Sequence, residues 1–280
     1  MTSVKNKFEG LYFKHQKGGK TVAFIPGVSE SGAFIQVITD TFSKNYTFSS
    51  GVMQPEVSIG KCTFSLHGAH IDLPDIKGDL SYSGITPVRS DIMGPFRFFP
   101  MECRHTVLSM RHRIHGSVTI QGQEYDFENG IGYVEGDSGR SFPKRYLWLQ
   151  ANDFEGGSFM LSVAEIPFLG FRFEGCICVV IIGQKEYRLA TYCGAKVVFL
   201  KDMVVVNQQN LRLMVKILTR GDSFSLAAPH NGKMQGLIKE HNHTSVEITL
   251  TKEDSVLCHW RSDNAGLEVC GYSFLSDSKR

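Results

Sequence analysis

Apolar and polar residues alternate with a period of two along much of this chain. In the segment 211–217 the aliphatic residues stand at every second position, separated by Arg212, Met214 and Lys216. The segment 245–250 repeats the pattern. Such alternation is typical of β-strands with one buried face, because successive side chains point to opposite sides of a strand. Helical spacing is nearly absent.

Turn-forming residues recur at short intervals between these segments. Examples are Gly18-Gly19, Ser50-Gly51, Gly156-Gly157 and Gly221-Asp222, and the chain contains 28 glycines but only nine prolines. This composition suits hairpins and strongly coiled strands. The sequence therefore predicts an all-β protein of many antiparallel strands, arranged as a barrel or a sandwich.

A weak internal repeat of a short sequence pattern indicates a duplication. The run Phe8-Glu9-Gly10 opens the chain, the run Phe154-Glu155-Gly156 stands near the middle, and an Ile-Pro pair follows each. A chain of 280 residues also fits two domains of about 140 residues each. We expect the boundary in the segment 141–144, where Pro143 ends a strand, giving domains 1–143 and 144–280.

Charge and hydropathy exclude several classes of protein. The 30 basic and 28 acidic residues leave a net charge of +2, without the clustered Lys and Arg that nucleic acids or acidic membranes require. The longest apolar run, 176–182, is far shorter than the ~20 residues of a membrane helix, and the first residues carry no apolar signal core. We expect a cytoplasmic protein without an integral membrane span.

The seven cysteines are an odd number spread over the chain, and none forms a C-x-x-C pair. We interpret them as reduced, mostly buried thiols. Cys176 and Cys178 share a strand face, but no second pair at zinc spacing accompanies them, so core packing is the better explanation and no metal site is expected.

His112 is a first candidate for chemistry. On the predicted strand 105–120 it is the single ionisable group on a face formed otherwise by Leu108, Met110, Ile114 and other apolar residues. It is either a hydrogen-bonded core histidine or, if this face lines a ligand cavity, a proton donor or acceptor in a dry site.

The glycine-rich segment 130–139 is a second candidate. Its glycines leave one face nearly bare, whereas Tyr133, Glu135 and Asp137 share the other. When two carboxylates lie this close together, their repulsion raises the pKa of one of them, which can keep that acid protonated near neutral pH. The alternative is an exposed strand end whose carboxylates pair with Arg140 or with Lys144.

The strand after Pro143 has two contrasting faces. Leu147, Leu149 and Ala151 form an apolar face, and the opposite face combines aromatic and amide side chains, namely Tyr146, Trp148, Gln150 and Asn152. Such a face is costly to bury without partners, so it borders either a ligand pocket or a second domain.

Taken in order, these strands resemble the tocopherol cyclase family. The family's signature reads roughly G-Y-x-E-x-D-W-G-x-x-F-P-x-x-W-x-W-x-Q-x-N, and residues 132–152 read GYVEGDSGRSFPKRYLWLQAN. Residues 8–14, FEGLYFK, resemble the family's opening F-E-G-W-Y-x-K. Two departures remove aromatic surface that could steady a carbocation: Ser138 and Tyr146 each stand where the family has Trp.

The resemblance implies two lipocalin-like antiparallel β-barrel domains and a hydrophobic substrate. In the reaction that it implies, the tail double bond of a prenylated quinol or another isoprenoid is protonated and the phenol oxygen closes a ring on the cation. Asp137 or Glu135 could supply the acid, and His112 or Gln150 the contact to the phenol. Further substrate contacts are expected from Tyr133, Trp148, Asn152, Arg140 and Tyr12.

No metal, nucleotide or redox cofactor is required for such a reaction. The expected partner is an apolar small molecule, which the protein could collect through a peripheral contact with a membrane surface. The alternative function is a non-catalytic lipid-binding protein that kept the barrel and lost the reaction. Ser138 favours this alternative, whereas the retained Glu135 and Asp137 favour an enzyme.

Overall fold

The computed structural model describes residues 7–168 and 170–272, and strands make up nearly all of its regular structure. The helical elements in these ranges are two short 3-10 turns, η1 (Gly94–Phe98) and η2 (Thr191–Cys193). The predicted all-β fold class is confirmed. Within the same ranges, we find no helix with the length and hydropathy of a membrane span.

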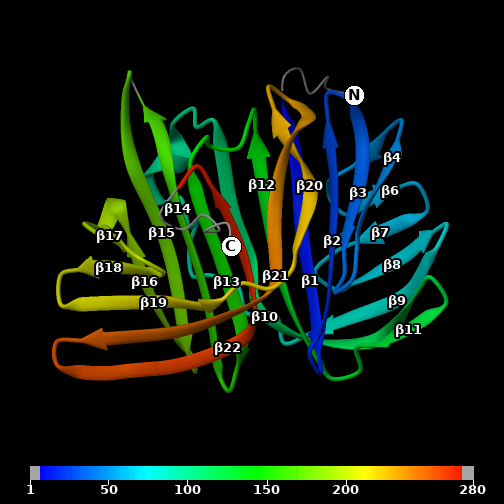
Figure 1. Ribbon diagram of the computed structural model, residues 1–280. Coiled ribbons are helices and arrows are strands. Elements are labelled where there is room, and N and C mark those ends of the chain that lie inside the picture. Colours follow the sequence, from blue (N-terminus) through cyan, green and yellow to red (C-terminus); the bar gives the residue numbers. More distant parts are fainter. Residues whose placement is uncertain (1–6, 169, 273–280) are drawn as a thin grey trace. The chain divides into compact units, whose positions relative to one another are not determined.

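The first sheet is antiparallel and contains the first twelve strands in the order β4-β3-β2-β1-β12-β10-β9-β8-β7-β6-β5, with β11 paired to β10 (Figure 1). The bounds of these strands are β1 Phe8–Lys17, β2 Lys20–Ser29, β3 Gly32–Ile38, β4 Ser43–Phe48, β5 Gly51–Val52, β6 Val57–Ile59, β7 Cys62–Phe64, β8 Gly68–Leu73, β9 Ile76–Ser83, β10 Cys103–Ile120, β11 Gln123–Asp126 and β12 Gly130–Gly139.

The second sheet contains the other ten strands in the order β16-β15-β14-β13-β22-β21-β19-β18-β17, with β20 paired to β21. Their bounds are β13 Tyr146–Phe154, β14 Gly157–Phe168, β15 Phe171–Ile182, β16 Lys185–Ala190, β17 Lys196–Leu200, β18 Met203–Gln208, β19 Leu211–Thr219, β20 Ser223–His230, β21 Lys233–Lys252 and β22 Ser255–Cys270.

The two sheets are not the closed barrels that the resemblance implied. Among the described residues, the pairing of the first sheet ends at β4 and β5, and that of the second ends at β16 and β17. β5 has only two residues, and they pair with β6. In the second sheet, the 3-10 turn η2 separates β16 from β17.

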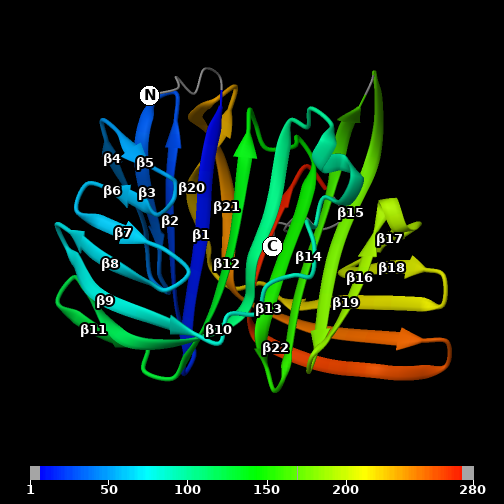
Figure 2. The ribbon, with the colours of Figure 1, turned by 180° about the vertical axis from the view of Figure 1, so that it is seen from behind.

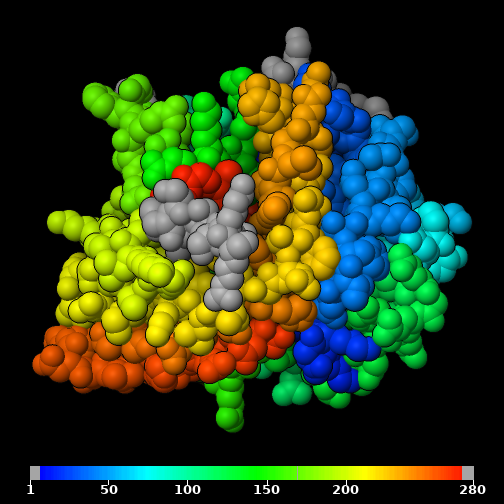
Figure 3. Space-filling model, viewed as in Figure 1, coloured from blue at the N-terminus to red at the C-terminus, as the bar shows by residue number. Residues whose placement is uncertain are grey.

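The chain divides into two compact units. The first comprises residues 1–92, 101–142 and 225–237, and the second comprises residues 93–100, 143–224 and 238–280. Residues 225–237 belong to the first unit because Gln36 of β3 exchanges two hydrogen bonds with the backbone of Ala227, at 2.9 and 2.7 Å. Figure 3 shows this yellow-to-orange segment against blue residues of the first unit. The domain boundary expected from the sequence stays a prediction.

Each unit has its own apolar core, built from the alternation seen in the sequence. In the second unit Leu213 lies opposite Leu250 and Val215 opposite Ile248, and all four side chains are fully buried. Cys176 and Cys178 belong to the same core, as expected. All seven cysteines of the chain are free thiols.

The core of the first unit contains a close approach between a glycine and a histidine. Phe13, Ile114 and Val134 pack into this core from β1, β10 and β12. Beside them, the buried imidazole of His112 lies against Gly132, where a Cβ would be only 2.0 Å from Nε2. The bare glycine face of β12 is thus a steric requirement of the core.

We expect Gly132→Ala to destabilise the protein by about 1–3 kcal/mol, because the ring of His112 would have to move within a packed core. Gly10→Ala is the matched control, since a Cβ there would find its nearest neighbour at 3.7 Å. Urea unfolding measures both variants. Equal stabilities of the two variants would contradict the close approach.

Candidate functional site

Three neighbouring strands of the first unit, β1, β12 and β10, carry the polar residues of the candidate site (Figure 2). Glu135 of β12 lies directly opposite Tyr12 of β1, and Asp137 lies opposite His105 of β10. Residues that face one another across an antiparallel pair project to the same side of the sheet. Tyr12, His105, Glu135 and Asp137 therefore share one face.

His105 joins the two carboxylates. Its Nδ1 lies 3.0 Å from Oδ1 of Asp137, and its Nε2 lies 3.2 Å from Oε2 of Glu135. The hydroxyl of Tyr133 donates a 2.5 Å hydrogen bond to the same Oε2 of Glu135. Tyr133 and Glu135 are buried, and Lys14, opposite Tyr133 on β1, is buried as well. We call the group Tyr133, Glu135, His105 and Asp137 the carboxylate–histidine network.

The carboxylates hold a proton on His105. Burial alone would favour the neutral ring, but the negative charges of Glu135 and Asp137 and their hydrogen bonds outweigh it and raise the pKa of His105 well above its ordinary 6.5. Burial and the neighbouring Glu135 raise the pKa of Tyr133 well above its usual range. At neutral pH the network therefore contains a positively charged imidazole and a neutral phenol.

Cys103 is attached to the edge of this network. Its Sγ lies 3.6 Å from Oδ1 of Asp137, on the same strand as His105. Burial and the charge of Asp137 raise the pKa of this thiol well above 9, so it is protonated at neutral pH. A thiol without thiolate character is a poor nucleophile, which argues against covalent chemistry at Cys103.

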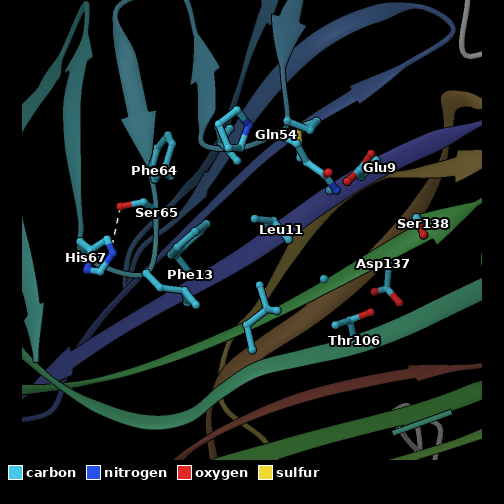
Figure 4. A pocket seen from close by; sticks show the side chains of 17 residues that line it. Glu9, Leu11, Phe13, Gln54, Phe64, Ser65, His67, Thr106, Asp137 and Ser138 are labelled. Atoms are coloured by element: carbon cyan, nitrogen blue, oxygen red, sulfur yellow. Dashed lines mark hydrogen bonds between the residues drawn. The ribbon is translucent and has the colours of Figure 1, made fainter. Parts of the chain in front are cut away.

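A cavity of about 570 Å³ opens in the first unit beside the end of β12. This volume lies within the range of small-molecule sites. In Figure 4, Phe13 and Phe64 lie at one end, Leu11 lies in the middle, and Glu9 and Ser138 lie at the other end. Its apolar lining is formed by Leu11, Phe13, Met53, Val57, Phe64, Leu66 and Leu108.

Asp137 belongs both to the lining of the cavity and to the carboxylate–histidine network. No other member of the network is among the described residues that line the cavity. Asp137 is partly exposed, whereas Glu135 is buried. Asp137 is thus the residue at which the network meets the cavity wall, and its Oδ1 faces His105 and Cys103 on the network side.

Within the described ranges, one group of side chains could bind a metal ion. Ligand atoms of His105, Glu135 and Asp137 lie within 4.8 Å of one another. The two ring nitrogens of His105 already face different carboxylates, so an ion would have to displace a proton that the raised pKa retains. This geometry favours a proton site, and the absence of a structural metal stays a prediction.

His112 lies apart from the network, in the core of the first unit. Its Nδ1 is 3.0 Å from the hydroxyl of Ser109, and its ring packs against Tyr82 with 4.6 Å between centroids. His15 lies nearby, with its Nε2 2.6 Å from the hydroxyl of Tyr82. Burial lowers the pKa of His112 to about 4, and burial together with the charge of His112 lowers that of His15 to about 3.

Other sequence-predicted site residues are not members of the network. Arg140 is exposed, and the cation that contacts both carboxylates is His105 instead. Trp148, Gln150 and Asn152 are buried on β13 of the second unit, on the side opposite to Leu149. Their roles in a site stay predictions.

Sequence reasoning did not connect His105 with the acid pair and did not identify the polar end of the cavity. His105 lies near the start of β10, which also carries His112, but only the register of β10 against β12 places His105 beside Asp137. Glu9 and Leu11 belong to the FEGLYFK segment, which the sequence marked as part of the family's pattern and not as a cavity wall. The signal available in the sequence was that Glu9 and Leu11 stand two residues apart and therefore share one face of the predicted strand.

Comparisons with known proteins agree with this fold. A family model described as tocopherol cyclase-like matches residues 13–172, just over half of the chain. No curated protein sequence matches significantly.

Three solved structures illustrate the likeness of fold. CghA with Sch210972 is 9% identical, with a TM-score of 0.60 over 94% of this chain and 88% of that chain. Kievitone hydratase from Nectria haematococca is 9% identical, with a TM-score of 0.57 over 96% and 90%. A putative AttH from Nitrosomonas europaea is 11% identical, with a TM-score of 0.55 over 95% and 93%.

The two neutral core histidines make stability depend on pH. In the unfolded chain they bind protons with a pKa near 6.5, but in the folded protein only at about 4 for His112 and about 3 for His15. Their contribution is complete above pH 6.5 and is lost as the pH falls through this window, by about 1.4 kcal/mol per pH unit for each group.

We expect His112→Leu to reduce the loss of stability on acidification by about 1.4 kcal/mol per pH unit between roughly pH 6 and 4, because one of the two neutral histidines is removed. Urea unfolding at several pH values measures the slope. Parallel slopes for the wild type and the variant would show that His112 is not a neutral core group.

Proposed function

Since this chain belongs to the tocopherol cyclase-like family, we propose that it is an enzyme of the cyclase or hydratase type that protonates a carbon–carbon double bond. The observation that carries the proposal is an apolar cavity lined at one end by Asp137, whose carboxylate contacts the protonated His105. The name of kievitone hydratase, a protein of similar fold, supports a reaction of the hydratase type.

The substrate that we propose is a prenylated quinol or a related isoprenoid. One alkene carbon takes a proton, the adjacent carbon becomes a tertiary cation, and the phenol oxygen bonds to it while the phenol proton leaves to a base. The product is an isomer of the substrate, so no oxidant or reductant is consumed. An acid held away from water and a base for the phenol proton are sufficient.

Asp137 is the proposed proton donor, because it joins the cavity and the network. His105 returns the proton to Asp137. Glu135 positions His105 and balances its charge, and Tyr133 fixes Glu135 through its hydrogen bond. In this proposal Glu135 and Asp137 still act as a pair, and His105 lies between them.

Further residues of the first unit and of strand β13 are proposed to contact the substrate. Tyr12 faces Glu135 and extends the polar face of the network. Trp148, Gln150, Asn152 and Arg140 stay proposed substrate contacts on the strength of the family pattern. His112 is the weakest catalytic candidate, because it is neutral and contacts Ser109 and Tyr82 in the core.

A non-catalytic lipid-binding protein is the second candidate function. Ser138 lines the cavity where the family pattern has Trp, so an aromatic surface for a cation is missing from this position. Mass spectrometry of apolar extracts from the purified protein identifies a co-purifying ligand. Recovery of that ligand unchanged, from a protein that converts no prenylated quinol or other isoprenoid tested, would favour this candidate over the enzyme.

We expect Asp137→Asn to lower turnover of a prenylated quinol by about 10²–10⁴-fold, because the amide keeps the shape and loses the acidic proton. Asp254→Asn, at an exposed turn of the second unit, is the control for an Asp-to-Asn change. Chromatography with mass detection measures the product, and reaction in D₂O should place one deuterium on the protonated carbon. Wild-type turnover by Asp137→Asn would exclude it as the donor.

The pH dependence of turnover tests the role of His105. Because its pKa is raised well above 6.5, His105 stays protonated through neutral pH, and a rate that needs this proton falls only at alkaline pH. His105→Gln should lower the rate and remove that alkaline limb. An alkaline limb of unchanged position in the variant would assign the titrating group elsewhere.

A further inference from the structure

The cavity of the first unit has two chemically different ends (Figure 4). Phe13 and Phe64 line one end, whereas Glu9, Ser138 and Thr106 line the other. Glu9 of β1 lies directly opposite Ser138 of β12, and Thr106 of β10 lies opposite Gly136, one residue before Ser138. Three adjacent strands therefore contribute polar groups at one level of the sheet.

The charged side chains that line the cavity are the carboxylates of Glu9 and Asp137, and the described lining contains no Lys or Arg. Asp137 is paired with the protonated His105, which reduces its effect on a ligand. His67 lies at the other end, beside Ser65. Glu9 is therefore the charge that an incoming polar group meets.

Basic residues near this end lie outside the lining. Arg104 is opposite Ser138 in the register but is exposed, where solvent screens its charge. Lys14 is opposite Tyr133 and is buried with the network, five residues along β1 from Glu9. Neither is among the lining residues.

We propose that the cavity binds an apolar tail whose head group is neutral or cationic and donates hydrogen bonds, such as a hydroxyl, a phenol or an amine. The same cavity discriminates against carboxylate and phosphate head groups. Glu9 accepts from a donor, and the hydroxyls of Ser138 and Thr106 both donate and accept. An anion would meet the like charge of Glu9 in a partly desolvated space, which is costly.

The head-group preference deepens the proposed function, on which it rests, because it concerns the same cavity. It is measured as binding without turnover. Selective binding without conversion would contradict only the proposed enzyme, whereas conversion without head-group selectivity would contradict only the preference.

Farnesol, farnesylamine and farnesoic acid share one tail and differ in the head group, and farnesyl phosphate adds a second anion. Displacement of the neutral dye Nile red at about pH 7.5, where the acid is ionised, gives their dissociation constants. We expect the alcohol and the amine to bind about tenfold more tightly than either anion, and a ratio below about threefold overturns the proposal.

Glu9→Gln should bring the acid within about threefold of the alcohol, because the amide keeps the size and loses the charge. Glu155→Gln is the matched control, since Glu155 is exposed at a turn of the second unit. Circular dichroism verifies the fold of both variants. Unchanged selectivity in folded Glu9→Gln, or an equal change in Glu155→Gln, overturns the assignment.

Ser138→Trp tests whether the ligands occupy this cavity. A large side chain at the polar end should weaken farnesol binding by about tenfold or more, because it fills the space of the head group. Wild-type affinity for farnesol in the folded variant would place the ligand elsewhere and overturn the proposal.

Discussion

The contact of one imidazole with two carboxylates organises the candidate site. Buried charges are tolerated only when they are paired, and Glu135 is buried close to Asp137 on the same strand. His105 places one ring nitrogen within 3.2 Å of each carboxylate, and the charge of the carboxylates in turn keeps the ring protonated. The position of His105 therefore determines where the proton of the network is held.

The two faces of β12 have different roles: one packs in the core of the first unit, and the other carries residues of the network. One face is nearly bare, so that His112 can approach Gly132 within the core. The other face carries Tyr133 and Glu135 in the network. Asp137, near the end of the strand, contacts His105 of the network, and it is also a residue of the cavity wall together with its neighbours Gly136 and Ser138.

The two buried groups of histidines in the first unit show how environment decides the role of a side chain. His105 lies between carboxylates and is charged, whereas His15 and His112 contact a hydroxyl or an aromatic ring and are neutral. Desolvation acts on all three, and nearby negative charge reverses its effect only at His105. The sequence pattern had drawn attention to His112, which is neutral, and not to His105, which is charged.

The sequence by itself determined the all-β class, the alternation that fills the two cores, and the shared face of Tyr133, Glu135 and Asp137. These features follow from the period of a strand, which local sequence encodes. Only the tertiary structure decided which residues stand beside that face, because strand register depends on pairing between distant segments. His105 reaches Asp137 across 32 residues of chain, and Glu9 reaches Ser138 from the other end of the first unit. The cation of the network and the polar end of the cavity therefore had no local signal strong enough to reveal them.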